Sequence, residues 1–131
     1  MKEDIHIPEV KDVYIAVVHE YNEVYRVYDW NAYIINYKSV ALDMVIVVTK
    51  GSSRDKITTT FRKKTDALPA KSFAKIEMNN DSGGCFVNVF NLSFFEDNKL
   101  FEKCFEFQKN SIHKQALKDI PLMGMKGVLA T

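Results

Sequence analysis

The sequence of 131 residues has few of the residues on which disulfide-rich or fibrous proteins depend, with two cysteines, three prolines and five glycines. Two cysteines form at most one bridge, which excludes a disulfide-rich scaffold. The longest run of aliphatic residues and methionine, Met44 to Val48, is far shorter than the roughly 20 residues of a membrane-spanning helix. Neither sign of charge predominates, since 18 basic and 17 acidic side chains leave a net charge of +1. We therefore expect neither a membrane-embedded protein nor a generally basic one.

The amino terminus shows no export signal. Residues Met1 to Pro8 include acidic side chains where a signal peptide has positive charge followed by an apolar stretch. We therefore expect a cytoplasmic protein with reduced thiols.

The composition favours β-structure. Apolar residues make up 47% of the chain and aromatic residues 12%, and valine and isoleucine are prominent among them, which suits pleated sheets. The length fits one domain. We predict a single domain over residues 1–131, with a flexible segment over 1–9 and a carboxy-terminal tail over 111–131.

The clearest local pattern is an aromatic hairpin over residues 86–107. Both arms alternate with a period of two, and the turn-type residues Glu96 to Lys99 separate them. Only one register places the aromatic side chains of both arms on one face, because a slip by one residue would scatter them. That register predicts three opposed pairs: Phe95 with Leu100, Phe94 with Phe101, and Phe90 with Phe105.

The same register separates the two thiols. It places Cys104 opposite Asn91 and Cys85 near Asn110, a separation of more than about 7 Å, which a disulfide cannot bridge. Neither cysteine has a histidine or basic neighbour within its strand that would activate it. We expect both to be free structural thiols.

Further strands are predicted upstream of the hairpin. Residues 30–37 and 42–49 are expected to pair with each other across the polar stretch Lys38 to Ala41. The run Met44 to Val48 is apolar on both faces, as is typical of a central strand covered from both sides. Strands are also predicted over residues 57–64 and 72–78, the first of them at a sheet edge because cations crowd one of its faces.

The segment from Val13 to Tyr28 fits two structures. Its apolar residues recur at helical spacing, but tyrosine, isoleucine and valine dominate it and no convincing N-cap precedes it. We favour a strand over Val13 to His19 and keep a helix as the alternative.

Together these segments predict an all-β fold. About seven strands with turn signals between them are typical of an immunoglobulin-like antiparallel β-sandwich, and a closed barrel is the alternative. A short helical turn is expected over Ser111 to Leu117. The apolar tail residues Ile120 to Met123 are expected to dock on the domain or to pair with another chain.

Three segments resemble a known family: Asp29 to Asn36, Leu68 to Glu77, and Ile120 to Leu122. They are similar to an uncharacterised family of small bacterial proteins, some of whose members carry the name of a phenylalanyl-tRNA synthetase alpha subunit. The resemblance covers most of the chain. Its motifs are structural in character, and it implies no catalytic residue, since an aminoacylating site needs a much larger catalytic domain.

Patterns of catalytic or metal-binding residues are lacking. His6, His19 and His113 are scattered, without the short ligand spacings of a zinc site. The stretch Thr49 to Ser53 lacks the first glycine of a phosphate-binding loop, and no serine stands in a Gly-x-Ser-x-Gly setting. We expect no catalytic residue, no metal and no cofactor.

Charge placement is the feature with functional content. Residues 50–75 carry eight basic and two acidic side chains, a net charge of +6, whereas residues 76–107 carry six acidic and two basic ones, a net charge of −4. Lys56, Arg62 and Lys64 are expected to share one strand face and are a candidate anion-binding site. The same cations would also protect a sheet edge from aggregation.

The leading hypothesis is a non-catalytic cytoplasmic interaction module that binds a protein partner or a second copy of itself through a sheet edge or the tail. The alternatives are an anion- or RNA-binding domain that uses the basic strand, and a small-ligand-binding or enzymatic sandwich with a pocket at one end.

Overall fold

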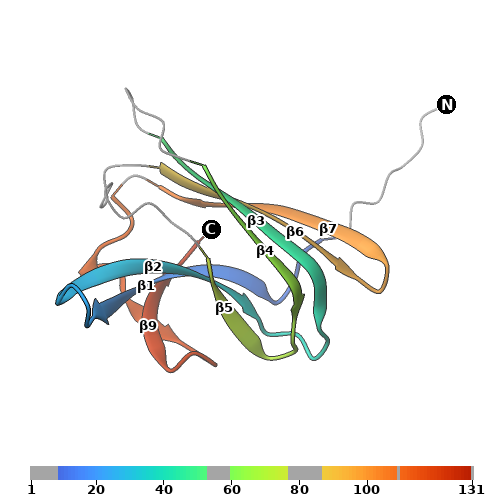
Figure 1. The fold of residues 1–131 in the computed structure, drawn as a ribbon, viewed down its shortest axis with the longest axis horizontal. Helices are drawn as coiled ribbons and strands as arrows, with labels where there is room; N and C mark the ends of the chain where they lie inside the picture. The colour runs from blue at the N-terminus through green and yellow to red at the C-terminus, as the bar shows by residue number, and fades with distance from the viewer. Residues whose placement is uncertain (1–8, 53–59, 77–86, 109, 131) are drawn as a thin grey trace.

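The computed structural model describes residues 9–52, 60–76, 87–108 and 110–130, which form two antiparallel sheets packed as an open β-sandwich (Figure 1). The five-stranded sheet contains, in order, β5 (Ser72–Ile76), β2 (Val27–Asn36), β1 (Val13–Asn22), β9 (Met125–Leu129) and β8 (Lys118–Ile120). The four-stranded sheet contains, in order, β4 (Phe61–Leu68), β3 (Leu42–Ser52), β6 (Val87–Glu96) and β7 (Lys99–Phe107). The predicted all-β sandwich is confirmed.

The inner faces of the two sheets form the main core. Aromatic side chains of β6 and β7 meet aliphatic side chains of β1, β2 and β3 there. Burial of each such side chain stabilises the fold by roughly 1.5–3 kcal/mol relative to exposure. The core includes Val13, Ile15, Val17, Ala32, Ile34, Val45, Val47, Phe90, Leu92, Phe94, Phe105 and Phe107.

The β6–β7 hairpin has the predicted register. Phe95 lies opposite Leu100, Phe94 opposite Phe101, and Phe90 opposite Phe105. Cys104 lies opposite Asn91 and is an exposed free thiol, whereas Cys85 lies outside the described residues. The aromatic alternation sets this register because its even-numbered β6 side chains are buried.

The first segment is a strand, and the helical alternative is wrong. β1 runs to Asn22, three residues beyond the predicted end, and pairs with β2 from Val13 opposite Asn36 to Asn22 opposite Val27. Its tyrosines, valines and isoleucine are residues that favour strands, and the first half of the strand is largely buried.

The predicted pairing of residues 30–37 with residues 42–49 is wrong. β2 is bonded on one side to β1 and on the other to β5, so it has no free edge for β3. The chain crosses to the other sheet after Asn36, a fully buried residue whose side-chain nitrogen donates to the carbonyls of Val40 at 2.9 Å and Pro69 at 3.0 Å. This amide therefore links the end of β2 to the turns that precede β3 and β5.

The strand predicted over residues 57–64 continues beyond Lys64. β4 covers Phe61–Leu68, because Leu68 is buried opposite Leu42 and so belongs to the sheet, not to the following turn. Residues 53–59 lie outside the described part of the chain. The expected edge position is confirmed, since β4 is the outermost strand beside β3.

With the tail included, the described residues form nine strands, where about seven were expected. The tail's 3-10 turn, Lys114–Ala116, lies within the predicted helical turn. β9 then pairs with β1, and Ile120 and Met123 bury against the outer side of the five-stranded sheet in a second apolar cluster. The tail therefore docks on its own domain.

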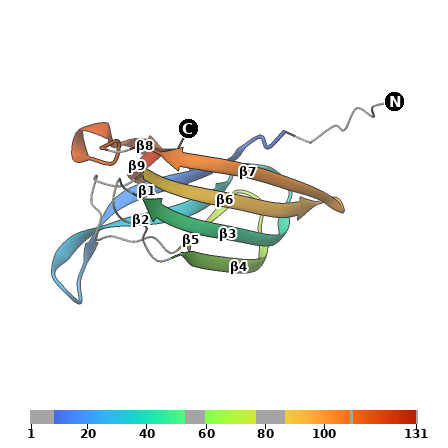
Figure 2. The ribbon, with the colours of Figure 1, turned by 90° about the horizontal axis from the view of Figure 1, so that it is seen from above.

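The described residues cover strand β3 on one of its two faces. Val45 and Val47 point into the core, whereas Ile46 and Val48 alternate with them and stay half-buried on the outer face. The expectation of a strand covered from both sides is wrong for this part of the chain. Figure 2 shows the outer face with no described element crossing it.

Candidate functional site

The β1–β2 hairpin projects beyond the end of the four-stranded sheet (Figure 2). β9 pairs with β1 only from Ala16 to Val18, and β5 pairs with β2 only from Ala32 to Asn36. In the described structure, residues 19–31 of the hairpin therefore pair only with each other. This projecting hairpin presents two faces and a tip to solvent.

The tip is held by the side chain of Asn22. Its Oδ1 accepts hydrogen bonds from the backbone N–H groups of Val24 at 2.9 Å and Tyr25 at 3.2 Å, an arrangement that asparagine commonly makes in turns. Arg26 closes the turn with a left-handed backbone (φ 57°) and an N–H that donates to the Asn22 carbonyl at 2.7 Å. The ordered turn leaves Val24 82% and Tyr25 75% exposed.

One face of the hairpin carries a row of four rings, which we call the aromatic row: Tyr21, Tyr28, His19 and Trp30. The ring centroids of successive members are 5.3, 4.9 and 4.5 Å apart. Trp30 packs against the main core, whereas Tyr28 is 62% and Tyr21 is 51% exposed. The row thus runs from the core out into solvent.

His19 lies in the middle of this row. Partial burial between the rings of Tyr28 and Trp30, and secondarily the positive charge of Lys114, lower the pKa of His19 below its usual value of 6.5. The imidazole is therefore favoured in its neutral form, which suits stacking within an aromatic row.

The opposite face of the hairpin holds a polar hollow of about 290 Å³. Glu20 Oε1 accepts hydrogen bonds there from the Tyr33 hydroxyl at 2.6 Å and Asn31 Nδ2 at 2.9 Å. Burial and the bond to Glu20 raise the pKa of Tyr33 above its usual value. The hollow is lined by Glu20, Tyr21, Asn22, Glu23, Asp29, Asn31, Tyr33 and Lys75.

These polar groups largely satisfy one another. Asn22 Nδ2 donates to Asp29 Oδ2 at 2.9 Å, beside the pair formed by Glu20 and Tyr33. Such a network stiffens the base of the hairpin. Among the described residues, no group of three histidine, cysteine, aspartate or glutamate side chains could hold a metal ion.

The predicted anion-binding residues lie on the other sheet. Arg62 and Lys64 are exposed on the outer face of β4, opposite Val48 and Ile46 of β3, while Lys56 lies outside the described residues. The hairpin's aromatic row is on the inner side of the five-stranded sheet, so the structure does not bring these cations together with a stacking platform.

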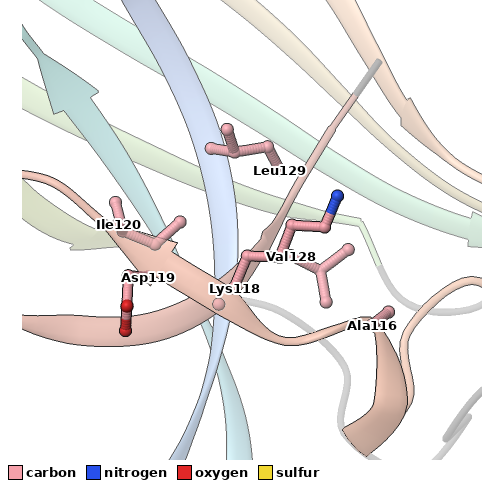
Figure 3. Close-up of a pocket in the computed structure, with 7 residues that line it drawn as sticks. Ala116, Lys118, Asp119, Ile120, Val128 and Leu129 are labelled. Atoms are coloured by element: carbon pink, nitrogen blue, oxygen red, sulfur yellow. The ribbon is translucent and has the colours of Figure 1, made fainter.

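A second hollow, of about 520 Å³, lies beside the tail strands and is mostly apolar. Figure 3 shows its lining by the 3-10 turn, β8 and β9, with Val128, Leu129 and Ile120 among the apolar side chains. Lys118 and Asp119 are its charged residues, and nothing in the lining forms a set of reacting groups. No helix in the described ranges has the length and apolarity to cross a bilayer.

The projecting hairpin was not predicted as a site from the sequence. The available signal was an alternating aromatic pattern that continues on both sides of Asn22, in strands longer than a sandwich core needs. Comparison of the chain with models of known families, with curated proteins and with solved structures finds no match.

Proposed function

We propose that this chain is a non-catalytic interaction domain that binds a protein partner through the projecting β1–β2 hairpin. The observation that carries the proposal is the exposure of Tyr21, Val24, Tyr25 and Tyr28 on the part of the hairpin, residues 19–31, that pairs with no other described strand. Isolated exposed apolar residues are common, but a contiguous exposed group of them marks an interaction surface.

The physical properties of the hairpin suit binding. Tyrosine supplies a large contact area with little rotamer freedom to lose, and tyrosines are enriched among the residues that dominate binding energy. The turn held by Asn22 and the hydrogen bond between Tyr33 and Glu20 order the hairpin before any partner arrives. A preordered surface lowers the entropic cost of association.

The charges around the hairpin indicate the chemistry of the partner. Residues 19–31 carry three carboxylates, Glu20, Glu23 and Asp29, and one guanidinium, Arg26, a net charge of −2. Lysine or arginine side chains of a partner would face Glu23 at the tip and stack on the exposed tyrosine rings, while Glu20 and Asp29 add negative charge on the opposite face. We therefore propose a basic segment of another cytoplasmic protein as the partner.

The proposal includes an immunoglobulin-like topology. In constant-type immunoglobulin domains the first, second, fifth and fourth strands form one sheet, and the third, sixth and seventh form the other. The order β5-β2-β1 in one sheet and β3-β6-β7 in the other supports this assignment. In this scheme β4 has moved to the edge beside β3, and β9 and β8 extend the first sheet.

Anion or RNA binding by the basic strand is the second candidate. Arg62, Lys63 and Lys64 are exposed together on an edge strand, which favours contact with phosphates. The distance between this edge and the tyrosines, and the acidic character of the hairpin, favour a protein partner instead. A small-ligand or enzymatic role has weaker support, because the polar groups that line the hollow bond to one another.

Selection from a displayed library of random peptides tests the proposal. The wild-type chain is the bait, and the variant Tyr25→Ser/Tyr28→Ser is used for counter-selection. We expect the selected peptides to be rich in lysine and arginine, and to bind the variant at least about tenfold more weakly than the wild type.

The matched control replaces two exposed apolar residues of the tail, in the variant Leu122→Ser/Leu129→Ser. Those side chains are 42% and 44% exposed and belong to the tail, whose strand β9 pairs with β1 only at Ala16 to Val18, outside residues 19–31, so binding should be unchanged. Peptides that are acidic, or that bind the tyrosine variant as well as the wild type, would contradict the proposal.

A further inference from the structure

The outer face of the four-stranded sheet has an apolar centre between two edges of opposite charge. Ile46 and Val48 of β3 and Val89 of β6 are half-buried in its middle. At one end Phe95 and Leu100 lie opposite each other and are 39% and 45% exposed. Within the described chain nothing packs on this face, and a group of exposed apolar residues of this kind marks an interaction surface.

The charges follow the strand order. One row across the sheet runs from Lys64 on β4, through Ile46 and Ser93, to Glu102 on β7. The next row begins with Arg62 on the same edge. The row beyond it runs from the exposed Lys50 on β3, through Val89, to Glu106 on the β7 edge. The β4 edge is therefore cationic and the β7 edge anionic on one face.

We propose that this face binds a second copy of the same chain, with a twofold axis parallel to the strands. Rotation about that axis places the cationic β4 edge of one copy over the anionic β7 edge of the other. This contact occurs twice, once along each lateral edge of the interface. Lys64 then faces Glu102 of the second copy twice, and the Phe95 and Leu100 ends coincide. An axis across the strands would instead place β4 over β4, where like charges repel.

The dimensions of the face suit such a contact. At about 4.8 Å per strand and 3.3 Å per residue, four strands of roughly nine residues span about 19 by 30 Å. Because side chains stand out from the sheet, the accessible surface of the face is larger than this flat rectangle. It comes close to the roughly 800 Å² that each partner contributes to a standard interface. Because the face is used on both copies, the contact is isologous and closes as a dimer.

Sedimentation velocity of the full chain over a range of concentrations and salt tests this proposal. We expect a reversible dimer whose Kd rises with salt, because the opposed charges are screened. Lys64→Glu and Glu102→Lys, each alone, should raise the dimer Kd by at least about tenfold, since each places like charges together. The double variant Lys64→Glu/Glu102→Lys exchanges the two charges and should restore the dimer.

The control Lys118→Glu reverses an exposed charge on β8, in the other sheet, and should leave the dimer intact. So should Tyr25→Ser/Tyr28→Ser, which distinguishes this surface from the hairpin. A monomer at every concentration up to about 1 mM, or a double variant as weak as the single ones, would overturn the proposal. Binding of a single-stranded RNA oligonucleotide that Lys64→Glu abolishes would assign the cations to phosphate contacts and would also overturn it.

Discussion

The Tyr33 hydroxyl donates a 2.6 Å hydrogen bond to Glu20 Oε1 across the β1–β2 ladder, at the point where the hairpin leaves the sandwich. Asn31 Nδ2 donates to the same oxygen at 2.9 Å. The carboxylate therefore fixes two side chains of the neighbouring strand. The base of the hairpin is stiffened on its polar face, while the aromatic row occupies the other face.

Removal of the Tyr33 hydroxyl should weaken the fold. Tyr33→Phe loses a hydrogen bond to a charged acceptor, which in a partly buried setting should lower the free energy of unfolding by about 1 kcal/mol. Urea denaturation measures the change. Tyr28→Phe is the matched control, because the Tyr28 ring is exposed and its hydroxyl makes no hydrogen bond in the described structure; equal losses for the two variants would contradict the role of Glu20.

The lowered pKa of His19 predicts a loss of stability in mild acid. In the unfolded chain the imidazole takes up a proton near pH 6.5, whereas in the folded chain its pKa lies lower, so the unfolded state binds more protons as pH falls below that value. Between about pH 7.5 and pH 5.5, the wild type should lose more free energy of unfolding than His19→Gln does. The opposite order would mean that the folded chain favours the charged imidazole.

Gly127 should be intolerant of a side chain. A Cβ at this position would lie 2.9 Å from the Val17 carbonyl oxygen and 2.9 Å from Val18 Cγ1, because β9 passes close to β1 there. Gly127→Ala should lower the free energy of unfolding by about 1–3 kcal/mol. Leu129→Ala, at an exposed position of the same strand, should cost less, and an unchanged Gly127→Ala variant would contradict the close pairing of the tail.

The aromatic hairpin should lose stability on one face only. Phe105 is buried and Glu102 is exposed on the opposite face, so Phe105→Ala should cost about 3–5 kcal/mol and Glu102→Ala less than about 0.5 kcal/mol. Thermal and urea unfolding at low protein concentration measure both. Similar losses for the two variants would show that both faces of β7 are packed within one chain.

The sequence predicts local strand register well where the alternation is strong. The phenylalanines of β6 and β7 leave one register that buries them together, and the structure has it. The partner of each strand is harder to predict, because the same alternation in β2 fits pairing with β1, β3 or β5. Here the buried amide of Asn36 and the two paired sides of β2 direct the chain to the other sheet.

The candidate site depends on a property that no local pattern contains. Tyr21 and Tyr28 have the same residue type and alternation as buried strand residues. They are exposed because the four-stranded sheet ends before it reaches them. The tail strands were missed for a similar reason, because β8 has three residues and β9 five, too few to show a period.

The most direct test of the proposed binding surface is the mapping of amide chemical shifts by NMR as a basic peptide from the library selection is added to the wild-type chain. We predict shift changes confined to residues 19–31, strongest near Tyr25 and Tyr28, and absent in Tyr25→Ser/Tyr28→Ser. Changes centred on β4 or on the tail strands, with the hairpin signals unmoved, would contradict the account.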